Sequence, residues 1–138
     1  MSKVNNLNPK KMMDLIVKRF SDPDEVRVFE KGKFELLTLP GMTIGKATYS
    51  PGWKWSEDVS PLSQTQFCNV EHLGMVLEGS ATVAFDNEEI RTLVKGDIFY
   101  VPPKPHDSWV VGDQEYVSIH FLGADSYATK ERSILFDD

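Results

Sequence analysis

The sequence predicts an all-β domain, a sandwich or a small antiparallel barrel, preceded by one short helix. From residue 24 onward the chain breaks into short alternating apolar and polar runs, with turn residues roughly every 8 to 12 positions. This spacing favours antiparallel strands over a parallel sheet, in which long helical stretches would separate the strands. At 138 residues, without repeats or a linker, the chain fits one domain.

A helix is expected first. Asn8 can cap it, and Pro9 suits the first helical turn, where a missing N–H costs nothing. Pro23 closes the segment because proline cannot continue the hydrogen-bond ladder. The apolar stripe between them recurs at helical spacing and consists of Met12, Leu15, Ile16 and Phe20. We interpret residues 1–23 as a helical brace on a sheet, residues 24–123 as the barrel and residues 124–138 as a tail.

The predicted strands follow in order. They span residues 26–29, 34–39, 42–50, 63–78, 81–85, 90–93, 98–101, 108–111 and 116–122. Asp86 and Asn87 offer a tight hairpin turn because both residue types tolerate positive φ. In the tail, residues 133–136 either pack as an edge strand or fray.

Charge and composition exclude several classes of partner. The net charge of −6 and the pI near 5.0 disfavour non-specific binding to nucleic acid or to an anionic membrane. No apolar run reaches the roughly 20 residues of a membrane span. The single cysteine excludes an internal disulfide, so we expect a reducing, cytoplasmic location.

Two stretches carry residue types that bind metals. In an unbulged strand over residues 63–78, Gln66, Cys68 and His72 share one face, because side chains alternate along a strand. His106 follows Pro105, which restrains the backbone just before the imidazole. Thiol, imidazole and amide together form part of a metal's ligand set. The alternative is structural: a half-buried, hydrogen-bonded His72, an inert core thiol and a surface-loop His106.

Two tryptophans, a third histidine and the absence of common catalytic motifs also bear on the function. Trp53 and Trp55 share a face and either wall a pocket or fill the core. His120 stands opposite the apolar Val117 and Ile119, which predicts that it points outward. The sequence contains no G-x-S-x-G elbow, no phosphate-binding glycine loop and no paired zinc cysteines.

The two stretches resemble the two motifs of the cupin superfamily. Counting back from Gly79, His72 falls where cupins have a glutamate ligand, and Cys68 and Gln66 fall where they have a His-x-His pair. In the second motif the glycine at 96 and the proline at 102 match, Lys104 replaces a glycine, and His106 arrives one residue early. Both motifs are therefore degenerate.

A closer likeness is to short, single-domain cupins of uncertain activity. It covers roughly residues 51–128 and includes a Pro-Gly-Trp-x-Trp-Ser run from Pro51, a Gly-Asp pair at Gly96 and a His-Asp-x-Trp run from His106. The resemblance implies a cupin-type antiparallel β-barrel, or jelly roll. Cupins include oxygenases, isomerases, lyases, sugar binders and sensor domains, and many are homodimers.

The resemblance also implies a site. His72, His106 and Cys68 would hold a divalent metal ion, for which the donors favour zinc, with iron and nickel as alternatives. Trp53, Trp55 and Gln66 would shape a pocket for a small polar metabolite, Gln66 by orienting water or substrate. The competing hypothesis is a non-catalytic ligand-binding or sensor module without metal. We expect neither a nucleic acid nor a membrane as a partner, and we expect the protein to form a homodimer.

Overall fold

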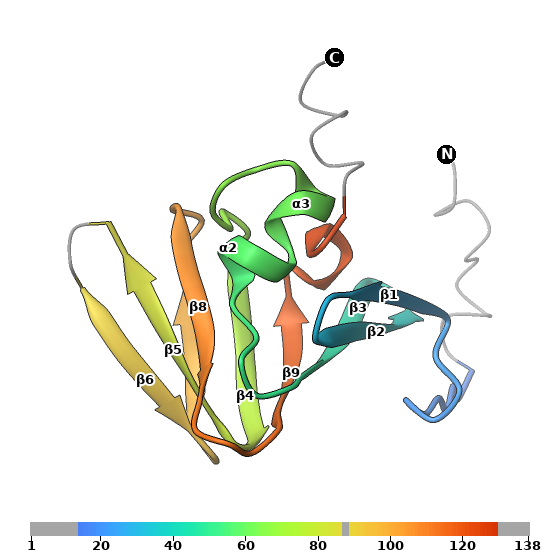
Figure 1. The fold of residues 1–138 in the computed structure, drawn as a ribbon. Coiled ribbons are helices and arrows are strands. Elements are labelled where there is room, and N and C mark those ends of the chain that lie inside the picture. The colour runs from blue at the N-terminus through green and yellow to red at the C-terminus, as the bar shows by residue number, and fades with distance from the viewer. Residues whose placement is uncertain (1–13, 87–88, 130–138) are drawn as a thin grey trace.

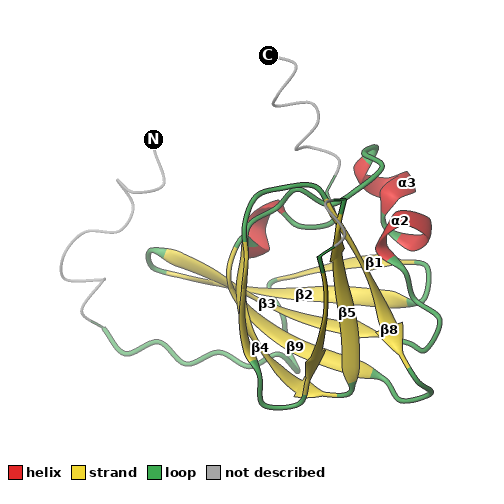
Figure 2. Cartoon of the chain, turned by 90° about the vertical axis from the view of Figure 1, so that its left-hand side faces the viewer, coloured by secondary structure: helices red, strands yellow, loops and turns green. Residues whose placement is uncertain are grey.

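The fold consists of two antiparallel β-sheets that face each other, as the two views in Figures 1 and 2 show. The structure is a computed structural model that describes residues 14–86 and 89–129 of the chain. The larger sheet contains, in spatial order, β1 (Glu25–Phe29), β2 (Gly32–Leu39), β3 (Met42–Tyr49), β9 (Tyr116–Leu122), β4 (His72–Glu78) and β7 (Ile98–Val101). The smaller contains β6 (Ile90–Val94), β5 (Ser80–Phe85) and β8 (His106–Val111).

The described residues also form three short helical segments. Helices α2 (Trp55–Asp58) and α3 (Ser60–Ser63) lie between β3 and β4, at one end of the sheets, and the 3-10 turn η2 (Ala124–Ser126) follows β9 (Figure 1). No helix in the described part of the chain is long and apolar enough to cross a membrane.

The all-β jelly roll expected from the sequence is confirmed, but the sheets do not close into a barrel. Strand β7 is one edge of the larger sheet, and β6 is one edge of the smaller. Closure would require continuous hydrogen bonding around the circumference. Instead a groove of about 520 Å³ lies between these edges, and its wall includes Leu93 from β6 and Val101 from β7.

The core lies between the inner faces of the two sheets. Strand β4 shows the alternation, since His72, Gly74 and Val76 are buried while Leu73 and Met75 are exposed. Gly74 is required by a close approach, because a side chain there would collide with the Ile119 carbonyl of β9 and with the Phe99 ring. The strand therefore presents His72 to the interior.

The strand predicted over residues 63–78 is shorter than expected. It begins only at His72, because Ser60–Ser63 is helical and Gln64 then adopts a left-handed conformation with φ of 63°. Pro61 favours this helical turn, since proline suits the first positions of a helix. Between Gln64 and His72 the chain is a loop in which Cys68 makes an isolated β-bridge to His106.

The N-terminal helix is not observed where the structure describes it. Residues 14–19 carry no helix, and Leu15, Ile16 and Val17 are 89, 40 and 64% exposed. A short helix needs its apolar face packed on other elements, and the described residues leave Leu15 and Val17 largely exposed. Residues 1–13, the tip of the 86–87 turn and the tail segment 133–136 lie outside the described residues.

Candidate functional site

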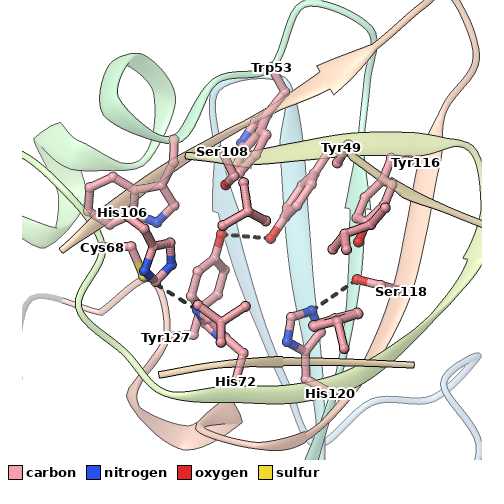
Figure 3. Close-up of a pocket in the computed structure, with 16 residues that line it drawn as sticks. Tyr49, Trp53, Cys68, His72, His106, Ser108, Tyr116, Ser118, His120 and Tyr127 are labelled. Carbon is pink, nitrogen blue, oxygen red and sulfur yellow. Dashed lines mark hydrogen bonds between the residues drawn. The ribbon is translucent and has the colours of Figure 1, made fainter. Parts of the chain in front are cut away.

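A cavity of about 50 Å³ lies between the two sheets (Figure 3). Its lining residues come from both sheets, from α2 and from the segment that follows η2. None of them is an Asp, Glu, Lys or Arg. Six of the sixteen lining residues are tyrosine, tryptophan or phenylalanine: Tyr49, Trp53, Trp55, Phe99, Tyr116 and Tyr127.

Three potential metal ligands meet at this cavity. One donor atom from each of Cys68, His72 and His106 lies within 4.8 Å of the other two. The three side chains are buried, with exposures of 2, 6 and 4%. The rings of His72 and His106 are 5.5 Å apart although they begin strands of different sheets, β4 and β8. The convergence that the sequence could only propose is therefore present.

His106 is held in the tautomer that a metal ligand needs. Its Nδ1 lies 2.8 Å from the carbonyl oxygen of Lys104, so this nitrogen donates a hydrogen bond and Nε2 keeps its lone pair. Burial lowers the pKa of His106, against smaller raising effects of that hydrogen bond and of Asp107. The imidazole is thus neutral at neutral pH, which is the form that binds a metal.

The donor separations fit a tetrahedral ion. Zinc bonds of about 2.3 Å to sulfur and about 2.0 Å to nitrogen, at a tetrahedral angle, place the two ligand atoms about 3.6 Å apart. Sγ of Cys68 lies 3.5 Å from Nε2 of His72. The His106 donor atom lies within 4.8 Å of both, which is close enough for the three to share one ion after a small side-chain adjustment. Three protein ligands leave the fourth position open.

Asp107 anchors the strand that carries His106. Its carboxylate accepts hydrogen bonds from the Ser56 amide at 3.0 Å, the Ser56 hydroxyl at 2.7 Å and the Ser108 amide at 2.9 Å. Because Ser56 belongs to α2, these bonds tie that helix to the start of β8. The carboxylate thus restrains the backbone beside the imidazole.

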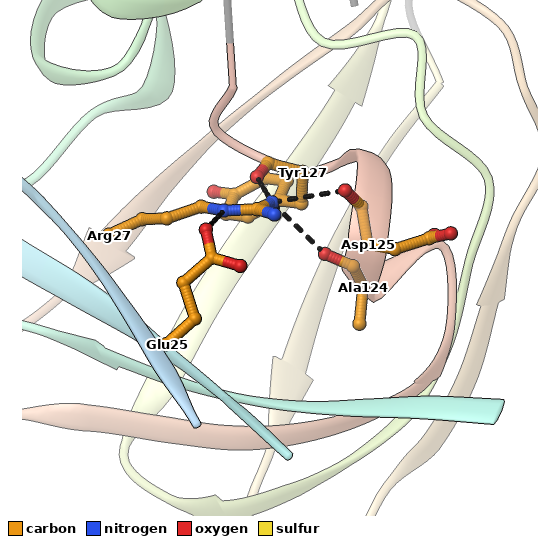
Figure 4. Close-up of polar contacts among 5 residues, drawn as sticks. All are labelled: Glu25, Arg27, Ala124, Asp125 and Tyr127. Carbon is orange, nitrogen blue, oxygen red and sulfur yellow. Dashed lines mark hydrogen bonds and ion pairs between the residues drawn. The ribbon is translucent and has the colours of Figure 1, made fainter. Parts of the chain in front are cut away.

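The segment after β9 carries Tyr127, which lines the cavity (Figure 3). Nη1 of Arg27 donates to the carbonyl oxygens of Ala124, Asp125 and Tyr127 at 3.4, 3.1 and 2.6 Å (Figure 4). The Tyr49 hydroxyl donates to that of Tyr127 at 2.6 Å, and burial raises the pKa of both phenols. Both therefore stay protonated, and the Tyr127 ring lies 5.5 Å from that of His72.

His120 is a cavity residue that the sequence reasoning placed wrongly. It is 6% exposed and lines the cavity, with Nε2 2.9 Å from the Ser118 hydroxyl (Figure 3). Burial lowers its pKa to about 4, so it is neutral. The polar face of β9 points inward because it borders the cavity. One sequence signal for the inward position of His120 is that Tyr116, Ser118 and His120 share one face of the strand. Such a set of polar residues fits the lining of a cavity as well as a solvated surface.

The remaining predicted site residues fall in two places. Trp53 and Trp55 are 1 and 2% exposed and both line the cavity, as one of the two interpretations required. Trp53 stacks on Tyr49 with ring centroids 3.8 Å apart. Gln66 is exposed and is not among the residues that line the cavity.

The groove between β6 and β7 adjoins the same cavity. Four residues line both spaces: Val83, Leu93, Phe99 and Val101. A ligand entering between the open sheet edges would therefore meet a wall made of these apolar side chains before it reached the metal-ligand cluster.

No protein-family model matches this chain, and no curated protein matches its sequence. Solved structures do match its fold. A protein of unknown function from Rhizobium leguminosarum has 20% identity and a TM-score of 0.58 over 80% of this chain and 97% of that one. The polyketide cyclase RemF of Streptomyces resistomycificus has 16% identity and a TM-score of 0.58 over 80% of each chain. Procruciferin, an 11S globulin of Brassica napus, has 15% identity and a TM-score of 0.55 over 79% of this chain and 31% of its own.

These likenesses concern the fold alone, because all three identities are low. The similar structures include cupin-fold proteins, among them RemF and the 11S globulin. The chain therefore has a cupin-type fold, in agreement with the resemblance of its two motifs. A particular subgroup of cupins is not identified by these structures, and neither is an activity.

Proposed function

We propose that this protein binds one divalent metal ion through Cys68, His72 and His106 and uses it to bind and transform a small molecule in the cavity. The observation that carries the proposal is the meeting of these three buried donors at one cavity. A buried thiol and two buried imidazoles are together the ligands that zinc prefers. Iron and nickel are the alternative ions that the same donor set can bind.

The three residues have distinct tasks. Cys68 would bind as the thiolate and so neutralise part of the ion's charge. His106 would bind through Nε2, with its other nitrogen held by the Lys104 carbonyl. When bound, the ion supplies a Lewis acid that polarises a carbonyl or activates water. Trp53 and Trp55 would enclose the ligand and keep bulk water out.

The lining favours Lewis-acid chemistry over general acid–base catalysis. No carboxylate or lysine lines the cavity. His120 is neutral there but, with a pKa of about 4, is a weak proton acceptor at neutral pH. The second candidate is a non-catalytic binding or sensor module without metal, in which the same cavity binds a ligand without turnover.

Zinc titration calorimetry on the untagged, metal-free protein tests the proposal. We expect one zinc ion per chain for the wild type and loss of binding in the double variant His72→Ala, His106→Ala. The matched control is His120→Ala, which removes the third buried histidine of the cavity and should keep one ion per chain. Circular dichroism establishes that each variant is folded. Stoichiometric zinc in the folded double variant would refute the proposed site.

A further inference from the structure

The charge of the proposed centre restricts what the cavity can hold, and this inference rests on the proposed function. A divalent ion, one Cys68 thiolate and two neutral imidazoles carry a net charge of +1. Among the cavity residues there is no acidic side chain to balance it. An uncompensated charge in an apolar interior is unfavourable, so a bound monoanion would complete the site electrically.

The same cavity has polar nitrogens that the described residues leave without a hydrogen bond. Nε1 of Trp53, Nε1 of Trp55 and Nδ1 of His120 are buried and have no hydrogen-bond partner within the described part of the chain. All three side chains line the cavity, and each is at least nine-tenths buried. An indole nitrogen can only donate, and buried donors normally have acceptors. Since residues 14–86 and 89–129 supply no acceptor to these groups, a bound ligand with acceptor atoms would satisfy them.

His120 can join the two indoles as a donor. Its Nε2 lies 2.9 Å from the Ser118 hydroxyl, whose hydrogen can rotate to donate to that nitrogen. The ring proton is then on Nδ1. An anion in the cavity stabilises this tautomer over the other, because only the Nδ1–H form donates to it.

The size of the cavity limits the anion. A volume of about 50 Å³ corresponds to roughly three to five water positions, at roughly 10–15 Å³ each. The metal ion itself would take one of these positions, next to its ligands. The remaining volume fits a molecule the size of formate or acetate, whereas a sugar or a nucleotide does not fit.

We propose that the cavity is a site for a small monoanionic carboxylate, with one oxygen directed to the cluster of Cys68, His72 and His106 and the other to buried N–H donors of His120, Trp53 and Trp55. A carboxylate matches both halves of the site, because it has two acceptor oxygens and a single negative charge. A cation would find no counter-charge in the lining, and a neutral amide would leave the charge of the centre uncompensated.

The test is to titrate the cobalt(II)-loaded protein with acetate and, separately, with the nearly isosteric but neutral acetamide. The visible absorption spectrum of the cobalt centre reports binding. We expect acetate to change the spectrum saturably and to bind at least tenfold more tightly than acetamide. His120→Phe should retain cobalt and weaken acetate binding about tenfold, the effect of one lost hydrogen bond to a charged group. Val28→Ala, at an exposed position of β1 outside the cavity, should keep acetate affinity within about twofold.

A second variant covers the case in which His120→Phe does not fold. Trp53→Phe keeps a ring against Tyr49 but removes the indole N–H, and it should also weaken acetate binding about tenfold. Equal affinity for acetate and acetamide, or no spectral change with either, would overturn the carboxylate site and leave the metal site standing. Unchanged acetate affinity in the folded donor variants would do the same. Failure of the wild type to bind cobalt would overturn both proposals.

Discussion

Cys68 and His106 are held opposite each other by two backbone hydrogen bonds. The Cys68 amide donates to the His106 carbonyl at 3.0 Å, and the His106 amide donates to the Cys68 carbonyl at 2.8 Å. Residues that exchange both bonds in an antiparallel pair project their side chains to the same side. This single bridge therefore sends the thiol and the imidazole into one cavity, although it joins a loop to the start of β8.

Cys68→Ser tests whether the thiol is a ligand. Serine preserves the backbone bridge but replaces a soft thiolate by a hydroxyl that stays protonated at neutral pH. We expect zinc affinity to fall at least 100-fold, with little change in the far-ultraviolet circular dichroism. Competition with a chromophoric chelator measures the affinity. If the variant holds zinc as tightly as the wild type, Cys68 is a core thiol only.

Asp107→Ala tests the anchor beside His106. The substitution removes three hydrogen bonds to a carboxylate and leaves the Ser56 amide without its acceptor. We expect the free energy of unfolding to fall by about 2–4 kcal/mol in urea denaturation. The exposed Asp113 provides the control, for which Asp113→Ala should change stability by no more than about 0.5 kcal/mol. Equal effects of the two substitutions would contradict this role of Asp107.

Arg27→Met tests the attachment of the segment that carries Tyr127. Methionine keeps much of the apolar stem but leaves the carbonyls of Ala124, Asp125 and Tyr127 without the guanidinium donor. We expect faster amide exchange across residues 124–128 and a loss of about 1–3 kcal/mol in unfolding free energy. Hydrogen–deuterium exchange with mass spectrometry measures the first effect. Exchange unchanged in that segment would show that Arg27 does not hold it.

The stability of the metal-free protein should depend on the protonation of His120. Burial lowers its folded pKa from 6.5 to about 4, so between these values the unfolded chain binds more protons than the folded one. The contribution of neutral His120 is fully present above pH 6.5 and is lost as the pH falls to about 4. The loss amounts to about 3 kcal/mol at 1.36 kcal/mol per pKa unit.

Chemical denaturation across this pH range checks the prediction. The His120→Phe variant should lose that part of the pH dependence while retaining a smaller one of the same sign from His106, whose pKa is also lowered by burial. A wild type equally stable at pH 4 and pH 7 would contradict the burial of a neutral His120. The rings packed around His120 bring no carboxylate that would stabilise its protonated form, and they are Phe34, His72, Phe99 and Tyr127.

Most strands could be predicted because their signals are local. Strand β5 pairs with β6 in an antiparallel hairpin, as the sequence predicts, and the period-2 alternation of β4 puts His72 inside. These features depend on neighbours a few residues away. The meeting of His72 with His106 was predictable only through the resemblance to the two cupin motifs.

The errors came from features that depend on distant parts of the chain. His120 faces inward because the cavity that it borders is assembled from two sheets, and no local pattern reports this. The open edges of β6 and β7 are likewise a property of the assembled sheets rather than of either strand. The helical brace predicted over residues 1–23 stays a prediction, because most of it lies outside the described residues, and Leu15 is 89% exposed where the description begins.

X-ray absorption spectroscopy at the zinc edge is the most direct test of the proposed centre. For the zinc-loaded wild type we predict one sulfur at about 2.3 Å and two imidazole nitrogens at about 2.0 Å, with the remaining position taken by a light atom. In Cys68→Ser the sulfur shell should disappear. A wild-type spectrum with oxygen and nitrogen neighbours only would contradict coordination by Cys68 and with it the three-ligand centre.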